Sequence, residues 1–138
     1  MDSQNIKCFH ARRHVVLLII LSIVTLFVAL SLPDELKISL GLPIILVIRA
    51  FWQYKLVYIS IGEDFITYRP AAPIRSSISI LFKEITSVSY KNNKVIINYI
   101  NKISNKQYTV KIPLSVMEVA EKEKLLSTLH IILKDKEK

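Results

Sequence analysis

The chain contains little cysteine, little glycine and few acidic residues, and each shortage excludes a class of protein. One cysteine, Cys8, cannot form an internal disulfide, so the 138 residues are not a disulfide-stabilised scaffold. Two glycines exclude collagen-like repeats and glycine-rich phosphate loops. Only 11 Asp and Glu stand against 19 Lys and Arg, which gives a net charge of +8 beside 51% hydrophobic residues. That combination favours a membrane protein whose basic surface faces anionic lipid.

The first long apolar run covers residues 15–32 and contains no charge, proline or glycine. A membrane-spanning helix needs about 20 apolar residues, so the run predicts a membrane helix over 15–32. Its polar members, Ser22, Thr25 and Ser31, can bond to the helix's own carbonyl groups. A secretory signal peptide is the alternative, although its apolar core is usually about 7–15 residues long and a second apolar stretch follows here at once.

A polar turn at residues 33–37 leads into that second stretch, which predicts another helix over about 36–54. Its strictly uncharged part, 38–48, has 11 residues, so a buried or re-entrant helix is the alternative to a spanning one. Arginine near the end of such a helix can extend its charge to the lipid headgroups, next to an interfacial aromatic belt. The residues expected at the membrane interface are these four, Arg49, Trp52, Tyr54 and Lys55, together with Arg12 and Arg13 before the first helix.

The distribution of charge predicts how residues 1–55, the expected membrane anchor, are oriented. Arg12 and Arg13 precede the first helix and Lys55 ends the second, whereas the turn between them contains Asp34 and Glu35. The positive-inside rule then places both ends in the cytoplasm and the turn outside. If only the first segment spanned the membrane, everything after it would lie outside.

Residues 56–138 read as a small α+β domain. Alternating and β-branched segments between turn residues predict strands at 56–61, 65–68, 77–81, 85–90, 95–100 and 107–112. Short turns between so many strands imply an antiparallel, strongly curved sheet or barrel.

A helix over about 116–134 is expected to cover that sheet. Ser115 followed by Glu118 has the spacing of a capping box. Apolar residues then recur at spacings of three and four, with the charged residues 121–124 on the other side. The apolar stripe consists of Val116, Val119, Ala120, Leu125, Leu126, Leu129, Ile132 and Leu133.

No catalytic arrangement is apparent, and we expect neither enzymatic activity nor a cofactor. His10 and His14 have a helical spacing, but Arg12 and Arg13 beside them repel a cation and no third ligand is near in sequence. His130 has no obvious partner. Cys8 is expected to be a free cytoplasmic thiol.

Two segments resemble the bacterial pleckstrin-homology-like domain. They are the central Leu81–Val88 stretch, with its aromatic-x-acidic-Ile element, and the late Val110–Ser115 stretch, with its Pro-Leu-Ser element before the last helix. The resemblance implies a helix-capped barrel with a binding or scaffolding role. Small cationic members with two membrane helices are similar to self-immunity proteins encoded beside leaderless bacteriocins.

Basic side chains are candidates for contact with acidic lipid or a partner. The phosphoinositide site of pleckstrin-homology domains is not carried over, because the turn between the first two predicted strands, 62–64, contains Glu63 and Asp64. The candidates are Arg69, Arg75, Lys91, Lys94, Lys102 and Lys106. The four lysines would each add about 1 kcal/mol against anionic lipid if they shared one edge, and the alternative is that they are merely solvated. Nucleic acid is not an expected partner, since no recognition module is present.

Three functions follow from this reading. The first is protection of the bacterial membrane from a pore-forming cationic peptide, which like charge would hold away from the surface. The second is a general envelope scaffold that recruits proteins or acidic lipid. The third is an accessory subunit of an exporter.

Overall fold

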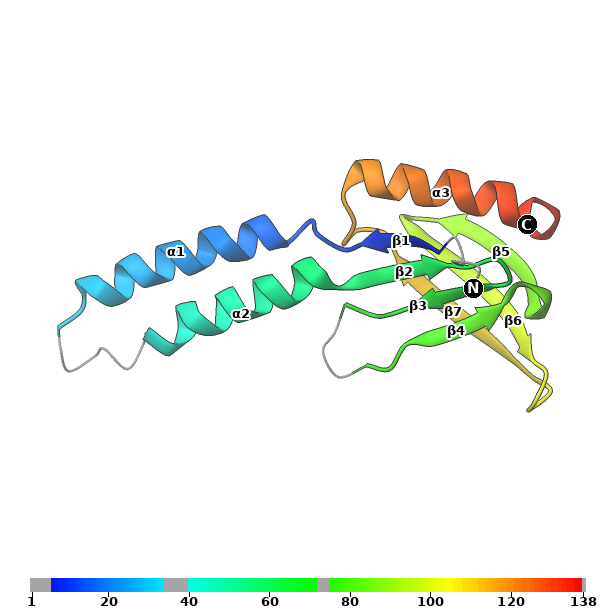
Figure 1. Ribbon diagram of the computed structural model, residues 1–138, viewed down its shortest axis with the longest axis horizontal. Coiled ribbons are helices and arrows are strands. Elements are labelled where there is room, and N and C mark those ends of the chain that lie inside the picture. The colour runs from blue at the N-terminus through cyan, green and yellow to red at the C-terminus, as the bar shows by residue number, and fades with distance from the viewer. Residues whose placement is uncertain (1–5, 34–39, 72–74, 138) are drawn as a thin grey trace, which may run out of the picture.

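The computed structural model describes residues 6–33, 40–71 and 75–137. A long helical hairpin projects from a compact domain of two sheets and one helix (Figure 1). The helices are α1 Val15–Ser31, α2 Gly41–Lys55 and α3 Val119–Leu133. The strands are β1 Lys7–His10, β2 Val57–Ile61, β3 Phe65–Tyr68, β4 Ile78–Leu81, β5 Ile85–Lys91, β6 Lys94–Asn101 and β7 Lys106–Pro113. Short 3₁₀ turns cover Phe82–Glu84 and Lys134–Lys136.

The strands form two antiparallel sheets, one in the order β1-β2-β3-β4 and one in the order β5-β6-β7. The predicted α+β class is confirmed, and each of the six predicted strands is present within one residue at either end. The tight β5–β6 turn is made by Asn92 and Asn93, both at positive φ (46° and 62°). Asparagine tolerates this left-handed conformation, and the turn's twist matches that of the flanking strands.

Strand β1 was not predicted, and it changes how the hairpin is connected. Phe9 of β1 pairs with Ile59 of β2, so a segment expected in the anchor belongs to the sheet. At four residues with one buried side chain, β1 is too short to produce an alternating pattern. The hairpin is therefore the connection between two neighbouring strands. The acidic turn at 62–64 joins β2 to β3 rather than the first two strands.

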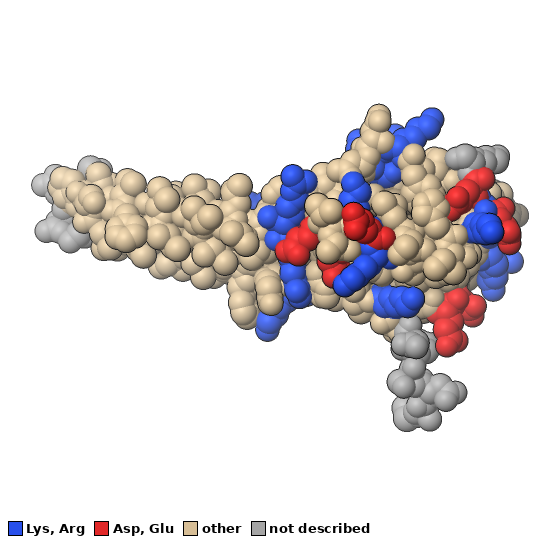
Figure 2. All heavy atoms as spheres, turned by 90° about the horizontal axis from the view of Figure 1, so that it is seen from above, with Lys and Arg blue, Asp and Glu red and all other residues tan. Residues whose placement is uncertain are grey.

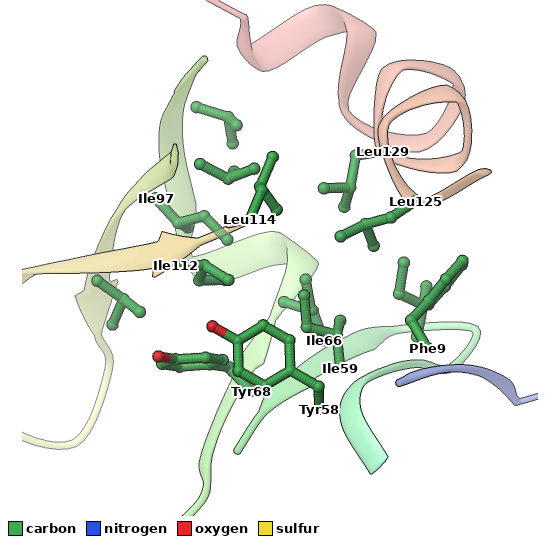
Figure 3. Close-up of a cluster of buried hydrophobic side chains, with 14 of the residues drawn as sticks. Phe9, Tyr58, Ile59, Ile66, Tyr68, Ile97, Ile112, Leu114, Leu125 and Leu129 are labelled. Atoms are coloured by element: carbon green, nitrogen blue, oxygen red, sulfur yellow. The ribbon is translucent and has the colours of Figure 1, made fainter. Parts of the chain in front are cut away.

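The core lies between the two sheets and under α3. Figure 3 shows Leu125 and Leu129 of α3 pointing toward side chains of both sheets, including Ile59 and Ile97. Leu133, one further turn along, is also buried, so one i, i+4 row of α3 closes the core.

Three expectations for this helix were wrong. It begins at Val119 rather than near 116, because residues 114–117 form a turn in which Met117 N–H donates to the Leu114 carbonyl (3.2 Å). Glu118 precedes the helix and no side chain caps it, so the Ser115 capping box is absent. The buried stripe is also narrower than expected, since Val119 is 72% exposed and Ile132 41% exposed.

Helices α1 and α2 pack antiparallel through small residues. Ser22 and Ala29 of α1 and Ala50 of α2 are buried, which lets the two backbones approach closely. Ser22 Oγ donates to the Pro43 carbonyl across the interface (3.0 Å) rather than to its own helix. Thr25 does bond within α1, as expected.

The face of the hairpin seen in Figure 2 has no charged side chain over most of its length. The exposed large apolar side chains on α1 are Val16, Leu17, Ile19, Ile20, Leu21, Ile23, Val24, Leu26, Phe27, Val28 and Leu30. Those on α2 are Leu42, Ile44, Ile45, Val47, Ile48, Phe51, Trp52 and Tyr54.

The helix predicted over 15–32 is present to within one residue, as α1. For the helix predicted over 36–54, residues 36–39 lie outside the described residues, as does most of the turn at 33–37, and the remainder is α2. Among the described residues, no helix has both the length and the hydropathy of a membrane-spanning segment, so the helices do not support the expected transmembrane hairpin.

Candidate functional site

The base of the hairpin is bonded to the domain from both of its helices. Gln53 of α2, only 8% exposed, donates its side-chain N–H to the carbonyl of Ala11 (3.2 Å), just before α1. Arg13 N–H donates to the carbonyl of Val116 in the turn before α3 (3.3 Å). These bonds hold the start of α1 beside the end of α2 and tie both to the turn before α3.

Four predicted interface residues surround this base, and we call Arg12, Arg13, Tyr54 and Lys55 the collar. The Arg12 guanidinium lies 4.3 Å from the centre of the Tyr54 ring, and its Nε donates to the Tyr54 carbonyl (3.3 Å). Arg13 donates to the carbonyl of Ser115 (3.1 Å). Figure 2 shows basic side chains gathered where the apolar hairpin meets the domain. The collar thus places positive charge at the boundary between an apolar and a polar surface.

The other two predicted interface residues, Arg49 and Trp52, lie on α2 just beyond the collar. With Ile45 and Ile48 they line a shallow hollow of about 420 Å³. At 1.5 Å per residue, Arg49 is about 9 Å along the helix from Lys55. Lys55 itself lies over the ring of Phe51, with its Nζ 4.5 Å from the ring centre. The six predicted interface residues are therefore close together at one end of the hairpin.

The four candidate lysines lie in two separate turns and do not share one edge. Lys91 and Lys94 flank the turn that begins β6, whereas Lys102 and Lys106 belong to the turn that follows it. Eight residues of extended strand separate the two turns, a distance of about 25 Å. The pairs therefore cannot contact the same small ligand.

Arg69 and Arg75 flank residues 72–74, which lie outside the described residues. Arg75 lines a hollow of about 470 Å³ with Tyr68 of β3 and Lys111 of β7. Sequence reasoning missed Lys111, although its place in the alternation of β7, between buried Val110 and Ile112, marks it as facing away from the core. Arg69 is exposed, and its backbone N–H donates to the Tyr58 carbonyl (2.8 Å).

Burial raises the pKa of three tyrosines, and the effect is larger for Tyr58 and Tyr90 than for Tyr99. Burial raises the pKa of Tyr58, whose hydroxyl donates to the Pro113 carbonyl (2.8 Å), with neighbouring Tyr68 adding to the effect. Burial, and then the charge of Glu137, raises the pKa of Tyr90 to about 12. The Tyr90 ring packs on His130, which in turn bonds to the Glu137 carboxylate. Tyr58 and Tyr90 both hold structural positions in the domain.

The histidines and the cysteine do not form a metal site with other ligands in the described part of the chain. Within the described ranges, no three His, Cys, Asp or Glu side chains are placed to hold a metal ion. His10 uses its backbone N–H to bond with the Glu121 carboxylate (3.4 Å), while His14 is exposed at the start of α1. Cys8 is exposed on β1.

Comparisons with protein-family models, with curated proteins and with solved structures found no match to this chain.

Proposed function

We propose that this chain is a non-enzymatic, membrane-anchored binding module whose hairpin is embedded in a lipid bilayer. The observation that carries the proposal is the apolar surface of the hairpin, which the domain does not cover. Exposed apolar patches beyond a few hundred Å² mark surfaces that a membrane or a partner covers. The collar then lies where anionic headgroups begin.

The length of the helices fixes how the hairpin must be accommodated. Helix α1, with 17 residues, is about 25 Å long, whereas the hydrocarbon core of a bilayer is about 30 Å thick. A short apolar segment is accommodated when the bilayer thins locally and flanking Trp, Tyr, Lys and Arg reach the headgroups. Trp52, Tyr54 and the collar cations supply such flanks at one end.

The pairing of β1 with β2 supports an arrangement in which both ends of the hairpin lie on the same side of the membrane. Residues 7–10 and 57–61 are neighbours in one sheet, so a chain that crossed only once would have to break it. The positive charge of Arg12, Arg13 and Lys55 favours the cytoplasmic side. The domain of two sheets capped by α3 is compatible with the pleckstrin-homology-like resemblance.

Labelling of single cysteines with a membrane-impermeant maleimide tests this arrangement. Cys8, exposed on β1, is expected to react in inverted membrane vesicles and not in intact cells. A cysteine at Glu35 in a Cys8→Ser background is expected to react in intact cells. Release of the unmodified chain from membranes by alkaline carbonate would refute the embedded hairpin, and labelling of Cys8 in intact cells would refute the orientation.

As its physiological role, we propose protection of the bacterial membrane from a pore-forming cationic peptide. Two features support it: the resemblance to small cationic immunity proteins, and a collar whose positive charge lowers the concentration of a cationic peptide at the surface. Expression in a sensitive strain is expected to raise survival against one leaderless peptide of a panel. An Arg12→Gln/Arg13→Gln variant, matched in expression, is expected to protect less.

Other outcomes assign the other roles. No protection, together with co-purifying proteins that are lost when residues 56–138 are removed, would indicate an envelope scaffold. Protection that requires co-expressed transporter subunits would indicate an accessory subunit of an exporter.

A further inference from the structure

The outward face of α2 changes from apolar to cationic toward the domain. Ile45, Arg49 and Trp52 follow one another at spacings of four and three residues, so they lie on one face of the helix. Ile48 lies beside them, and these side chains line the hollow of about 420 Å³. Helix α1 covers a different face of α2, the one that contains Ala50.

Arg49 differs from the other cations at this end of the hairpin. Arg12 and Lys55 lie over aromatic rings, and Arg13 donates to a carbonyl oxygen. The side chain of Arg49 is exposed, and within residues 6–33, 40–71 and 75–137 it makes no hydrogen bond or ion pair. A guanidinium near apolar surroundings is stable only when an anion or water pairs with its N–H groups. The hollow therefore has a cationic end to which no residue in the described part of the chain is bonded.

We propose that this hollow binds one anionic phospholipid, with the phosphate on Arg49 and Trp52 and an acyl chain along Ile45 and Ile48. The inference rests on the embedded hairpin proposed above. The planar guanidinium matches two phosphate oxygens at once, and the indole N–H of Trp52 is a further donor. The order of the side chains, apolar first and cationic nearer the collar, is the order of acyl chain and phosphate in a lipid whose headgroup faces the domain.

The surrounding charge favours a lipid with net negative charge. A zwitterionic phosphatidylcholine carries its own cation beside the phosphate, which the nearby Lys55 and collar arginines repel. Phosphatidylglycerol has no such cation. Each basic group near an anionic surface favours binding by about fivefold, so the loss of one pairing is expected to have an effect of that size.

Native mass spectrometry of the full chain, extracted from nanodiscs of equal phosphatidylglycerol and phosphatidylcholine, tests the site. The unmodified chain is expected to retain one phosphatidylglycerol in preference to phosphatidylcholine. Arg49→Gln is expected to reduce that preference by about fivefold, and Arg49→Lys by less, because lysine keeps the charge without the planar fork. Lys55→Gln, the matched loss of a cation that already has an aromatic partner, is expected to change it less than Arg49→Gln.

Two further arms separate a lipid from a free anion and this inference from the proposed function. Glycerol phosphate, which offers the anion without acyl chains, is expected not to displace the retained lipid, and displacement would refute the role of Ile45 and Ile48. A chain that stays in carbonate-washed membranes while Arg49→Gln retains phosphatidylglycerol like the unmodified chain would refute the site alone. Release of the chain by carbonate would refute the embedded hairpin first, and the site with it.

Discussion

Replacement of Phe9 by alanine measures whether the residues ahead of the hairpin belong to the folded domain. Phe9 is 5% exposed, pairs with Ile59 and belongs to the main core cluster. Truncation of a buried phenylalanine to alanine costs about 3–5 kcal/mol, because apolar contacts are lost and a cavity remains. If Phe9 merely flanked a membrane helix, its truncation would leave the stability of the domain unchanged.

The assay is urea unfolding of the full chain in mild detergent, followed by pulse proteolysis. With a denaturant slope of about 2 kcal/mol per M, the loss lowers the urea midpoint by about 2 M. Cys8→Ala, on the same strand but exposed, is the matched control and is expected to change the stability by less than about 0.5 kcal/mol. Equal midpoints for Phe9→Ala and Cys8→Ala would refute the assignment of β1 to the sheet.

Three further substitutions or titrations test other contacts. In Gly62→Ala, the added Cβ would lie 2.5 Å from a ring carbon of Phe65, so we expect a loss of about 1–3 kcal/mol in the same unfolding assay. Phe65→Leu in that background should recover part of the loss, and no loss in Gly62→Ala would show that the ring yields freely. Gln53→Leu leaves the Ala11 carbonyl without its donor and is expected to lower the free energy of unfolding by about 1–3 kcal/mol. An unchanged urea midpoint would show that this bond does not help to attach the hairpin to the domain. The pKa of Tyr90 is raised from 10.0 to about 12, so the stability from its protonated form is complete below about pH 10 and is lost as the pH rises toward 12. Tyr58, whose pKa is also raised, stays in Tyr90→Phe, so the expected result is the loss of one late-titrating tyrosine from the phenolate absorbance, and no loss in this variant would contradict the assignment.

Most of the domain could be predicted because its strands are long enough to show their pattern. In β6, the buried Val95 and Ile97 alternate with less buried neighbours, and Asn92 and Asn93 mark the turn before it. Such alternation and turn chemistry are local signals that a single sequence contains. They predicted where the strands lie, but the division into sheets of four and three strands depends on pairings between distant residues.

The predictions of secondary structure failed where a local sequence pattern is short or where tertiary packing overrides it. The four residues of β1 become a strand because β2 offers a partner, and nothing in Lys7–His10 alone signals it. Ser115 and Glu118 have the spacing of a capping box, but burial of Met117 (2% exposed) holds the chain in a turn and delays the helix. A local motif is overridden when the core takes up a neighbouring side chain.

The candidate site was predictable in part, for an electrostatic reason. Positive and aromatic residues beside apolar runs identify an interface from sequence, and Arg12 and Tyr54 do lie in contact. The positions of the lysines in the two later turns could not be predicted in this way, because the charge of a loop does not indicate at which end of a sheet the loop lies. Only the register of β6, which separates Lys94 from Asn101, decides that question.

The insertion of the hairpin between two paired strands also has a consequence for the order of folding during synthesis. Strand β1 leaves the ribosome first and cannot pair until β2 has been made, after the 46 residues from 11 to 56. Closure of a flexible loop of that length costs about 3 kcal/mol of chain entropy. Docking of α1 against α2 brings the two ends together beforehand, since Gln53 then bonds to Ala11. Substitutions at the α1–α2 interface, such as at Ser22, should therefore slow the folding of a domain that they do not touch.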